Sequence, residues 1–189
     1  MSLQLLQSLP CPRREGVTTL ELKTAEELID PALEKRWSLR RGERRADVLR
    51  EILSAFVARG GPVSVNAIIA AFPDRPAQIV REIVTALDDE DLIQVTDEQV
   101  VIAYPFSASP TAFVVGLVAG GERYACCAID ALGIAPMLEQ PVHVRSECHH
   151  YRMPLDFSVS PMGPAPNADG VLVWVEKRTE GQPRVATWL

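Results

Sequence analysis

The stretch that decides the fold reads YACCAIDALGIAPML and covers residues 124–138. It is long enough for one principal helix, and Gly133 and Pro136 predict that the far end of this helix frays. Segments of β-strand character flank it, namely residues 112–118, 142–146, 155–159 and 171–175. The pattern predicts a small mixed or antiparallel sheet with one main helix packed against it, which is an α+β arrangement.

The residues before this region have a helical pattern. From Ala46 onward apolar residues recur at helical spacing, namely Val48, Leu49, Ile52, Leu53, Phe56 and Val57. Ser64 is expected to cap a short second helix. A third helix has an expected inner face of Ile79, Val80, Ile83, Val84 and Leu87. Two β-rich segments follow at 92–95 and 100–104, and three helices with a hairpin predict a winged-helix module.

Changes in composition divide the chain into three parts. Residues 1–22 lack periodicity and are interpreted as an N-terminal arm. Residues 23–105 are expected to form the winged-helix-like module, beginning with a short helix capped by Thr24. Residues 106–189 are expected to form the α+β domain, because the character of the sequence changes after a proline- and serine-rich connector.

Charge and hydropathy narrow the class of protein. The chain has 189 residues, of which 47% are apolar and 23% charged, as in folded globular proteins. No apolar run reaches the ~18 residues that span a bilayer, and the first residues lack the basic start of a secretory signal. These features predict a cytoplasmic protein with no membrane partner.

The third helix bears on nucleic-acid binding. It ends in the acidic run Asp88-Asp89-Glu90-Asp91, and the whole chain has a net charge of −6. Four acids at one helix end would repel phosphates, so no nucleic-acid partner is expected. The module is interpreted as structural or substrate-covering. The alternative is a winged-helix regulator with the second half as its sensor, which salt-dependent duplex binding would reveal.

The four cysteines are the main candidates for chemistry, and they are Cys11, Cys126, Cys127 and Cys148. Cys127 and Asp130 are three residues apart, so on a helix they would share one face. A thiolate is a soft ligand that binds a soft metal, and a carboxyl group can accept the thiol proton and pass a proton to a departing group. A helix that starts just before Cys127 is expected to lower the pKa of its thiol.

Other readings of these residues have less support. Cys126 would point about 100° away from Cys127 on a helix, which favours a small buried residue over a second metal ligand. A cysteine protease needs a histidine base, and His143 has no evident orienting partner. Cys148-His149-His150 lacks the spacing and the fourth ligand of a zinc site. Cys11 is interpreted as an incidental thiol of the arm.

Three segments together resemble the organomercurial lyases, also called alkylmercury lyases. They read YACCAIDALGI at 124–134, PVHVRSEC at 141–148 and LDFSVSP at 155–161. The resemblance spans about residues 111–176, and the winged-helix-like first half is similar to the layout of that family. The combination of the three segments is more specific than any one of them.

The resemblance implies protonolytic cleavage of carbon–mercury bonds, giving a hydrocarbon and Hg(II), in mercuric resistance. It implies that Cys127 is the attacking, mercury-holding thiolate and that Asp130 carries the proton and helps to hold the metal. Cys148 would be a buried structural cysteine. The resemblance also implies no organic cofactor, mercury bound as substrate and product, and low-molecular-weight thiols or a mercury-accepting protein as partners.

The sequence departs from the family at one position. The family has a second catalytic cysteine after its final strands, whereas residues 171–189 contain no cysteine. One thiolate is expected to activate the carbon–mercury bond less than two, because each sulfur ligand adds electron density. Cys126 is the candidate additional thiol. The alternative is a non-catalytic relative that binds a soft metal or thiophilic ligand through Cys127, recognisable by Hg(II) binding without bond cleavage.

Overall fold

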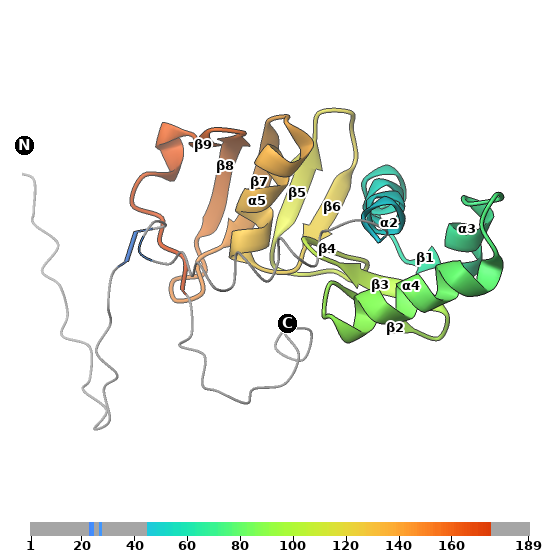
Figure 1. The fold of residues 1–189 in the computed structure, drawn as a ribbon. Coiled ribbons are helices and arrows are strands. Elements are labelled where there is room, and N and C mark those ends of the chain that lie inside the picture. Colours follow the sequence, from blue (N-terminus) through green and yellow to red (C-terminus); the bar gives the residue numbers. More distant parts are fainter. Residues whose placement is uncertain (1–22, 25–26, 28–44, 175–189) are drawn as a thin grey trace, which may run out of the picture. The chain divides into compact units, whose positions relative to one another are not determined.

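The structure is a computed structural model that describes residues 23–24, 27 and 45–174 (Figure 1). The chain divides into two compact units, Met1–Arg40 and Arg41–Leu189. The expected arm, with Cys11, lies outside the described residues.

The first unit contains the helix cap that the sequence predicts at Thr24. The backbone N–H of Glu27 donates to Thr24 Oγ1 at 3.4 Å, and the backbone N–H of Thr24 donates to Glu27 Oε2 at 2.7 Å. This reciprocal pair is a capping box, which satisfies two backbone donors at a helix start. The rest of the expected helix lies outside the described residues.

The second unit begins with three helices, namely α2 (Ala46–Arg59), α3 (Val65–Ala70) and α4 (Ala77–Asp89). Their inner faces follow the predicted spacing, with Val48, Ile52 and Phe56 buried on α2 and Val80, Val84 and Leu87 buried on α4. The predicted cap at Ser64 is confirmed, since its side chain accepts from Asn66 N at 3.2 Å. Ile79 was expected on the inner face of α4 but is 44% exposed.

A hairpin follows the helices, formed by β2 (Ile93–Thr96) and β3 (Gln99–Ala103). Asp97 and Glu98 connect the strands with φ of 50° and 59°, as a two-residue hairpin turn requires. The short β1 (Val63–Ser64) pairs antiparallel with β3. Figure 1 shows the three helices grouped around this hairpin.

The remaining elements are β4 (Phe106–Ser107), β5 (Val114–Leu117), β6 (Glu122–Ala125), α5 (Ala128–Leu138), β7 (Val142–Glu147), β8 (Pro154–Ser160), β9 (Gly163–Pro164) and the 3₁₀ helix η2 (Pro166–Ala168). The strands form one sheet in the order β1-β3-β4-β6-β5-β7-β8-β9, with β2 also on β3. Every pairing is antiparallel. The second half is therefore antiparallel rather than mixed, and the α+β class is confirmed.

Strand β4 makes the sheet continuous. Phe106 pairs with Ala103 on one side and with Ala125 on the other, so the helix-flanked hairpin and the strands of the second half share one hydrogen-bonded ladder. The Phe106 ring is fully buried and lies 6.4 Å from the ring of Phe56 on α2, nearly parallel to it. The core therefore extends through the position at which the sequence predicts a domain boundary.

A buried arginine strengthens the same connection. Arg123 on β6 donates through Nε to the carbonyl oxygens of Phe56 at 2.9 Å and Val57 at 2.8 Å. Its Nη1 donates to Glu122 O at 2.7 Å, and its Nη2 also donates to Val57 O. Carbonyl groups near a helix C-terminus lack donors within the helix. Arg123 supplies donors to Val57 O, and it adds a bond to Phe56 O, which also accepts from the Gly60 N–H at 2.9 Å. The side chain is only 9% exposed, so these bonds lie out of water.

Helix α5 packs against β6, β7, β8 and β9 and lies on one face of the sheet (Figure 1). Ala131, Ile134 and Ala135 are its buried residues, and small side chains allow a close approach to the strands. Among the described residues, no helix combines the length and apolar character needed to cross a membrane.

Two predictions about this half are wrong. The predicted helix at 124–138 begins at Ala128, because the residues before it belong to β6, and it continues through Pro136 to Leu138. The predicted strand at 171–175 is absent from residues 171–174, and Val175 lies outside the described residues. No strand among the described residues pairs with these four residues. Their β-propensity alone is not enough to form a strand.

Candidate active site

The candidate site lies at the junction of β6 and α5. Cys127 is the N-cap of α5, with extended backbone angles of φ −148° and ψ −179°. Its Sγ accepts a hydrogen bond from the backbone N–H of Asp130 at 3.4 Å. The prediction placed both residues on one face inside a helix. The structure instead puts Cys127 just before the first helical residue, and the cap geometry brings it together with Asp130.

The pair forms a capping box made of unusual residues. Cys127 Sγ accepts from the Asp130 N–H at 3.4 Å, and the Asp130 carboxyl group lies close enough to the Cys127 backbone N–H and thiol for both to influence its pKa. A capping box ordinarily joins Ser or Thr to Glu, and the same two contacts arise here from Cys and Asp. The helix start therefore holds a thiol and a carboxyl group in contact, with their rotamers fixed by backbone bonds.

The electrostatics of the pair differ from the prediction. The pKa of Cys127 is raised to about 11, and burial is the largest cause. The neighbouring Asp130 carboxylate also raises this pKa, by more than the backbone N–H groups at the helix start lower it. Burial also raises the pKa of Asp130 above its ordinary value, against the hydrogen bonds from Cys127. The predicted lowering of the thiol pKa by the helix start is therefore wrong, because desolvation outweighs it.

This arrangement keeps a proton between sulfur and carboxylate. The thiol does not ionise readily beside the Asp130 carboxylate, because two adjacent anions repel each other and burial adds to the cost. The thiol proton is thus retained until a ligand binds sulfur strongly enough to displace it, and the carboxylate in contact is then the nearest acceptor. The pair has the chemistry of a soft-metal ligand joined to a proton carrier.

Cys126 lies behind this pair. It is 4% exposed, and its backbone N–H donates to Pro105 O at 3.0 Å. Burial, followed by the charge of Asp130, raises the pKa of the Cys126 thiol well above its usual range. A neutral, buried thiol agrees with the expectation of a small apolar residue. Its proximity to Cys127 leaves it the candidate additional thiol.

Tyr104 is a residue that sequence reasoning missed. It lies in the turn between β3 and β4, next to Pro105, whose carbonyl accepts from Cys126. The Tyr104 hydroxyl oxygen is buried and has no hydrogen-bond partner among the residues that the structure describes. A buried hydroxyl without a partner costs about 1–3 kcal/mol. The residue stands 23 positions before Cys127 in the chain, so only the sheet pairing places it near the site.

Burial raises the pKa of the Tyr104 hydroxyl well above its usual range. The carboxylates of Asp91 and Asp130 raise it further, Asp91 by more than Asp130. The phenol therefore stays protonated and is a hydrogen-bond donor near the thiol–carboxyl pair.

The other cysteine and the histidines lie elsewhere. Cys148 is half-buried in the turn after β7, where its backbone bonds to Met153 and Arg152. His143 lies exposed across the β7–β8 pair, with Nε2 2.7 Å from Asp156 Oδ1. Within the described residues, no three His, Cys, Asp or Glu side chains come together as a metal site.

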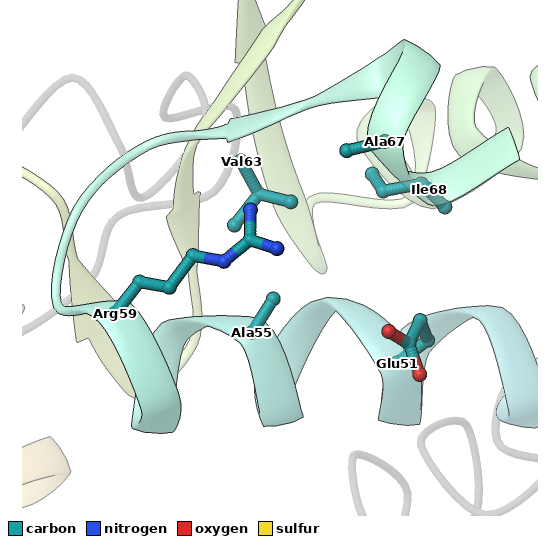
Figure 2. A pocket seen from close by; sticks show the side chains of 6 residues that line it. All are labelled: Glu51, Ala55, Arg59, Val63, Ala67 and Ile68. Atoms are coloured by element: carbon teal, nitrogen blue, oxygen red, sulfur yellow. The ribbon is translucent and has the colours of Figure 1, made fainter. Parts of the chain in front are cut away.

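A small pocket lies away from this site, between α2, β1 and α3 (Figure 2). Its lining consists of Glu51, Ala55, Arg59, Val63, Ala67 and Ile68. Figure 2 shows the side chains of α2 on one side and those of α3 on the other. Its volume of about 20 Å³ is room for roughly one water molecule, too little for an organic substrate.

The fold is an antiparallel α+β arrangement. Its candidate site is a cysteine at the N-cap of a helix, next to a carboxyl group. Residues 106–188 match the family model MerB, which is described as alkylmercury lyase. The second half of the chain, which carries the Cys127–Asp130 pair, is thus similar to the alkylmercury lyases.

Two known proteins illustrate the likeness. An alkylmercury lyase of Staphylococcus epidermidis is 32% identical over 110 residues, which are 58% of this chain and 48% of that protein. The chain thus spans about half the length of this curated relative. The crystal structure of the mercury-bound form of MerB2 is similar in fold, with a TM-score of 0.60 and 24% identity over 70% of this chain and 65% of that one.

Proposed function

We propose that this protein is an organomercurial lyase-like enzyme that cleaves carbon–mercury bonds by protonolysis. The observation that carries the proposal is the Cys127–Asp130 capping box, in which a thiol and a carboxyl group share a proton at the start of α5. The family match of residues 106–188 supports the substrate class.

The reaction follows from the pair in two steps. In the first, the Cys127 sulfur bonds to mercury and displaces, as a thiolate, the sulfur ligand that the organomercurial brought with it. The Cys127 proton passes to the Asp130 carboxylate. In the second, Asp130 gives this proton to the carbon, the electron pair of the carbon–mercury bond forms the new C–H bond, and the hydrocarbon leaves. Hg(II) stays on the Cys127 sulfur with the Asp130 carboxylate beside it, and no oxidation or reduction occurs.

The raised pKa values suit both steps. Burial raises the pKa of Asp130, so its carboxyl group holds the displaced proton more readily than an exposed aspartate would. Both residues are half-buried, which limits the access of water. We propose that Cys126 is the additional thiol that approaches mercury in the product state, and that low-molecular-weight thiols or a mercury-accepting protein remove the ion.

The direct test is benzene release from phenylmercury in excess thiol. We expect benzene above a control with thiol alone, and we expect Cys127→Ser to abolish it. Cys126→Ser is expected to retain turnover unless Cys126 supplies the second sulfur. Tight Hg(II) binding by the wild-type chain without any benzene would contradict the lyase proposal and support a non-catalytic metal-binding relative.

We also propose that residues 23–105 are a winged-helix-like module that covers the site and does not read DNA. Arg75, which precedes α4, and Arg81 on α4 are both engaged in ion pairs. Arg75 binds Asp47 at 2.5 Å, and Arg81 binds Glu98 at 2.5 Å. An electrophoretic shift of a DNA duplex that weakens with salt would contradict this proposal.

The setting proposed for the enzyme follows from its chemistry. We propose that it acts in the cytoplasm in mercuric resistance, where free thiols are abundant, and that it needs no organic cofactor. Turnover by protein freshly purified without added cofactor would support this. Dependence on an added coenzyme would contradict it.

A further inference from the structure

A threonine hydroxyl lies between the two strands that lead to the candidate site. Thr111 precedes β5, and β5 pairs antiparallel with β6. One step beyond the pair of Val114 and Tyr124, this register sets Phe113 opposite Ala125, the last residue of β6. Opposite residues at such a position exchange two backbone hydrogen bonds in a regular ladder. The first of the two is present, since the Ala125 N–H donates to Phe113 O at 2.9 Å.

The second bond of this pair passes through the Thr111 side chain. The Phe113 N–H donates to Thr111 Oγ1 at 3.2 Å, and the Thr111 hydroxyl donates to Ala125 O at 2.6 Å. A hydroxyl has one hydrogen to give, so its contact with Phe113 O at 3.4 Å is secondary to the much shorter contact with Ala125 O. The hydroxyl thus takes the place of the second ladder bond, and without it the Ala125 carbonyl loses this donor.

The relay ends two residues before Cys127. On the other side of β6, the Cys126 N–H donates to Pro105 O at 3.0 Å, and Pro105 directly precedes β4. The end of β6 is therefore fixed from both neighbouring strands, by Thr111 on the β5 side and by Pro105 on the β4 side.

The backbone of Cys127 needs support from both directions. Its extended angles, φ −148° and ψ −179°, place it between the strand and the helix. The helix holds its C-terminal side, because the Ala131 N–H donates to Cys127 O at 3.0 Å and the Asp130 N–H donates to its Sγ at 3.4 Å. On its N-terminal side, the position of Cys127 depends on the bonds of Ala125 and Cys126.

We propose that Thr111 is a positioning residue of the candidate site, whose hydroxyl fixes the last carbonyl of β6 and thereby holds Cys127 at the N-cap of α5 beside Asp130. For its role in turnover the inference rests on the proposed function. The positioning itself is a property of the folded chain and can be measured without mercury. Thr111 acts through the Ala125 carbonyl and takes no part in the chemistry itself.

The test measures hydrogen exchange of single backbone amides by NMR in the full-length protein, without mercury. We expect Thr111→Val to speed exchange of the Cys126 and Asp130 N–H groups about fivefold, since the loss of one hydrogen bond favours local opening by about that factor. These two groups donate to Pro105 O and to Cys127 Sγ, not to Thr111. Faster exchange there therefore shows that the hydroxyl holds the turn beyond its own partners.

Two further variants serve as controls. Thr111→Ser keeps the hydroxyl and should stay within about twofold of the wild type. Ser160→Ala removes a hydroxyl with the same pattern at the opposite end of β8, where Ser160 Oγ accepts from the Met162 N–H at 3.2 Å and donates to Gly163 O at 3.0 Å. This variant should leave exchange of the Asp130 N–H unchanged.

Three results would overturn the proposal. The first is faster exchange of the Ala125 N–H in Thr111→Val with no change at Asp130, which would confine the hydroxyl to its own ladder. The second is an equal acceleration at Val144 and at other amides of β7 and β8, which would mean a general loss of stability. The third is a loss in Thr111→Ser as large as that expected of Thr111→Val, and this result counts even where the valine variant does not fold.

A second readout uses phenylmercury. We expect Thr111→Val to lower kcat about tenfold with a smaller change in KM, because a displacement of about 1 Å between reacting groups can cost as much as a hundredfold in rate. Thr111→Ser should restore kcat, and Ser160→Ala should not change it. If the wild type releases no benzene, the proposed function fails, while the exchange series still decides the positioning role. An unchanged kcat of Thr111→Val in an active enzyme would overturn the role in turnover.

Discussion

At the scale of single residues, the candidate site is defined by two side chains that control each other's proton. Burial raises the pKa of both groups; Asp130 raises the pKa of the Cys127 thiol further, whereas the hydrogen bonds from Cys127 favour the ionised form of Asp130. Their contact comes from the cap of α5, so the geometry of the chemistry is also the geometry of a helix start. Substitutions at Asp130 should therefore separate reactivity of the thiol from catalysis.

Asp130→Asn is expected to make Cys127 more reactive and the enzyme inactive. Removing the carboxylate removes a charge that holds the thiol pKa up, so the pKa falls toward its ordinary value while burial keeps it somewhat above. Alkylation of Cys127 at pH 8 should rise several-fold, and benzene release should fall by about a hundredfold or more, since general-acid catalysis contributes roughly 10²–10⁴. Slower alkylation in this variant would contradict the charge argument.

The stability of the protein should fall in alkaline solution. The folded pKa of Cys127 is about 11, above the value of 9.0 expected for an exposed thiol. The folded state therefore keeps a proton that the unfolded state has lost, and this contribution to stability is present below pH 9 and disappears as pH rises through about 11. Urea unfolding at pH 8 and pH 10.5 measures the loss, and Cys127→Ala should reduce the slope.

At the scale of elements, the sequence predicts the long helices but not the junction of β6 and α5. Periodicity predicted α2 and α4 because their apolar faces are long and regular. The start of α5 was missed because its cap is a cysteine, which is not a usual cap residue, and because Tyr124 and Ala125 suit a helix as well as a strand. Only the pairing of Ala125 with Phe106 assigns them to β6.

The sequence predicted one part of the site, namely that Cys127 and Asp130 lie together. Cys127 and Asp130 are three residues apart, and this spacing brings them together in a capping box as it would inside a helix. The direction of the thiol pKa required knowledge of burial, which spacing does not contain. Tyr104 depends on long-range strand pairing through β4, a two-residue strand with no sequence signal of its own.

Cys127→Ser should preserve α5 while it removes the chemistry. A serine Oγ is a stronger cap than a sulfur, so its contact with the Asp130 N–H persists or shortens. We expect the free energy of unfolding at pH 7 to be equal to that of the wild type or up to about 1 kcal/mol greater, and Cys127→Ala to be less stable than Cys127→Ser by about 0.5–2 kcal/mol. Urea denaturation of the three proteins measures this. A strongly destabilised Cys127→Ser would contradict the cap assignment.

At the scale of the whole second unit, one side chain ties the helical part to the strand that precedes the site. Arg123 holds the carbonyl oxygens of Phe56 and Val57 at the end of α2. The guanidinium also limits its surroundings, since a Cβ at Gly60 or Gly121 would lie 3.0 Å from Arg123 Nη1, and both glycines have positive φ. The tie thus depends on Arg123 and its near neighbour Gly121 in one part of the chain and on Gly60, which caps α2, in another.

Arg123→Met should cost about 1–3 kcal/mol of unfolding free energy, because it leaves the Val57 carbonyl without its donor and removes the second bond to Phe56 O. Arg123→Lys should recover part of this, since an ammonium group cannot reproduce the planar fork of a guanidinium. Arg145→Met is the matched control on the exposed part of β7, where the ion pair with Glu122 is worth about 0–1 kcal/mol. Equal losses for the two methionine variants, measured in urea, would contradict the role of the buried arginine.

The two-residue strand β4 has a consequence for how this protein can be handled in pieces. A fragment that begins at Phe106 would keep β4 but lose β3, which pairs with it through Ala103 and Ile102. Its open backbone edge and the uncovered Phe106 ring would invite strand pairing between molecules. Such a fragment should sediment as aggregate when expressed alone and become monodisperse when residues 1–105 are co-expressed with it. The two halves would then behave as complementing partners, and inheritance of one half without the other would be selected against.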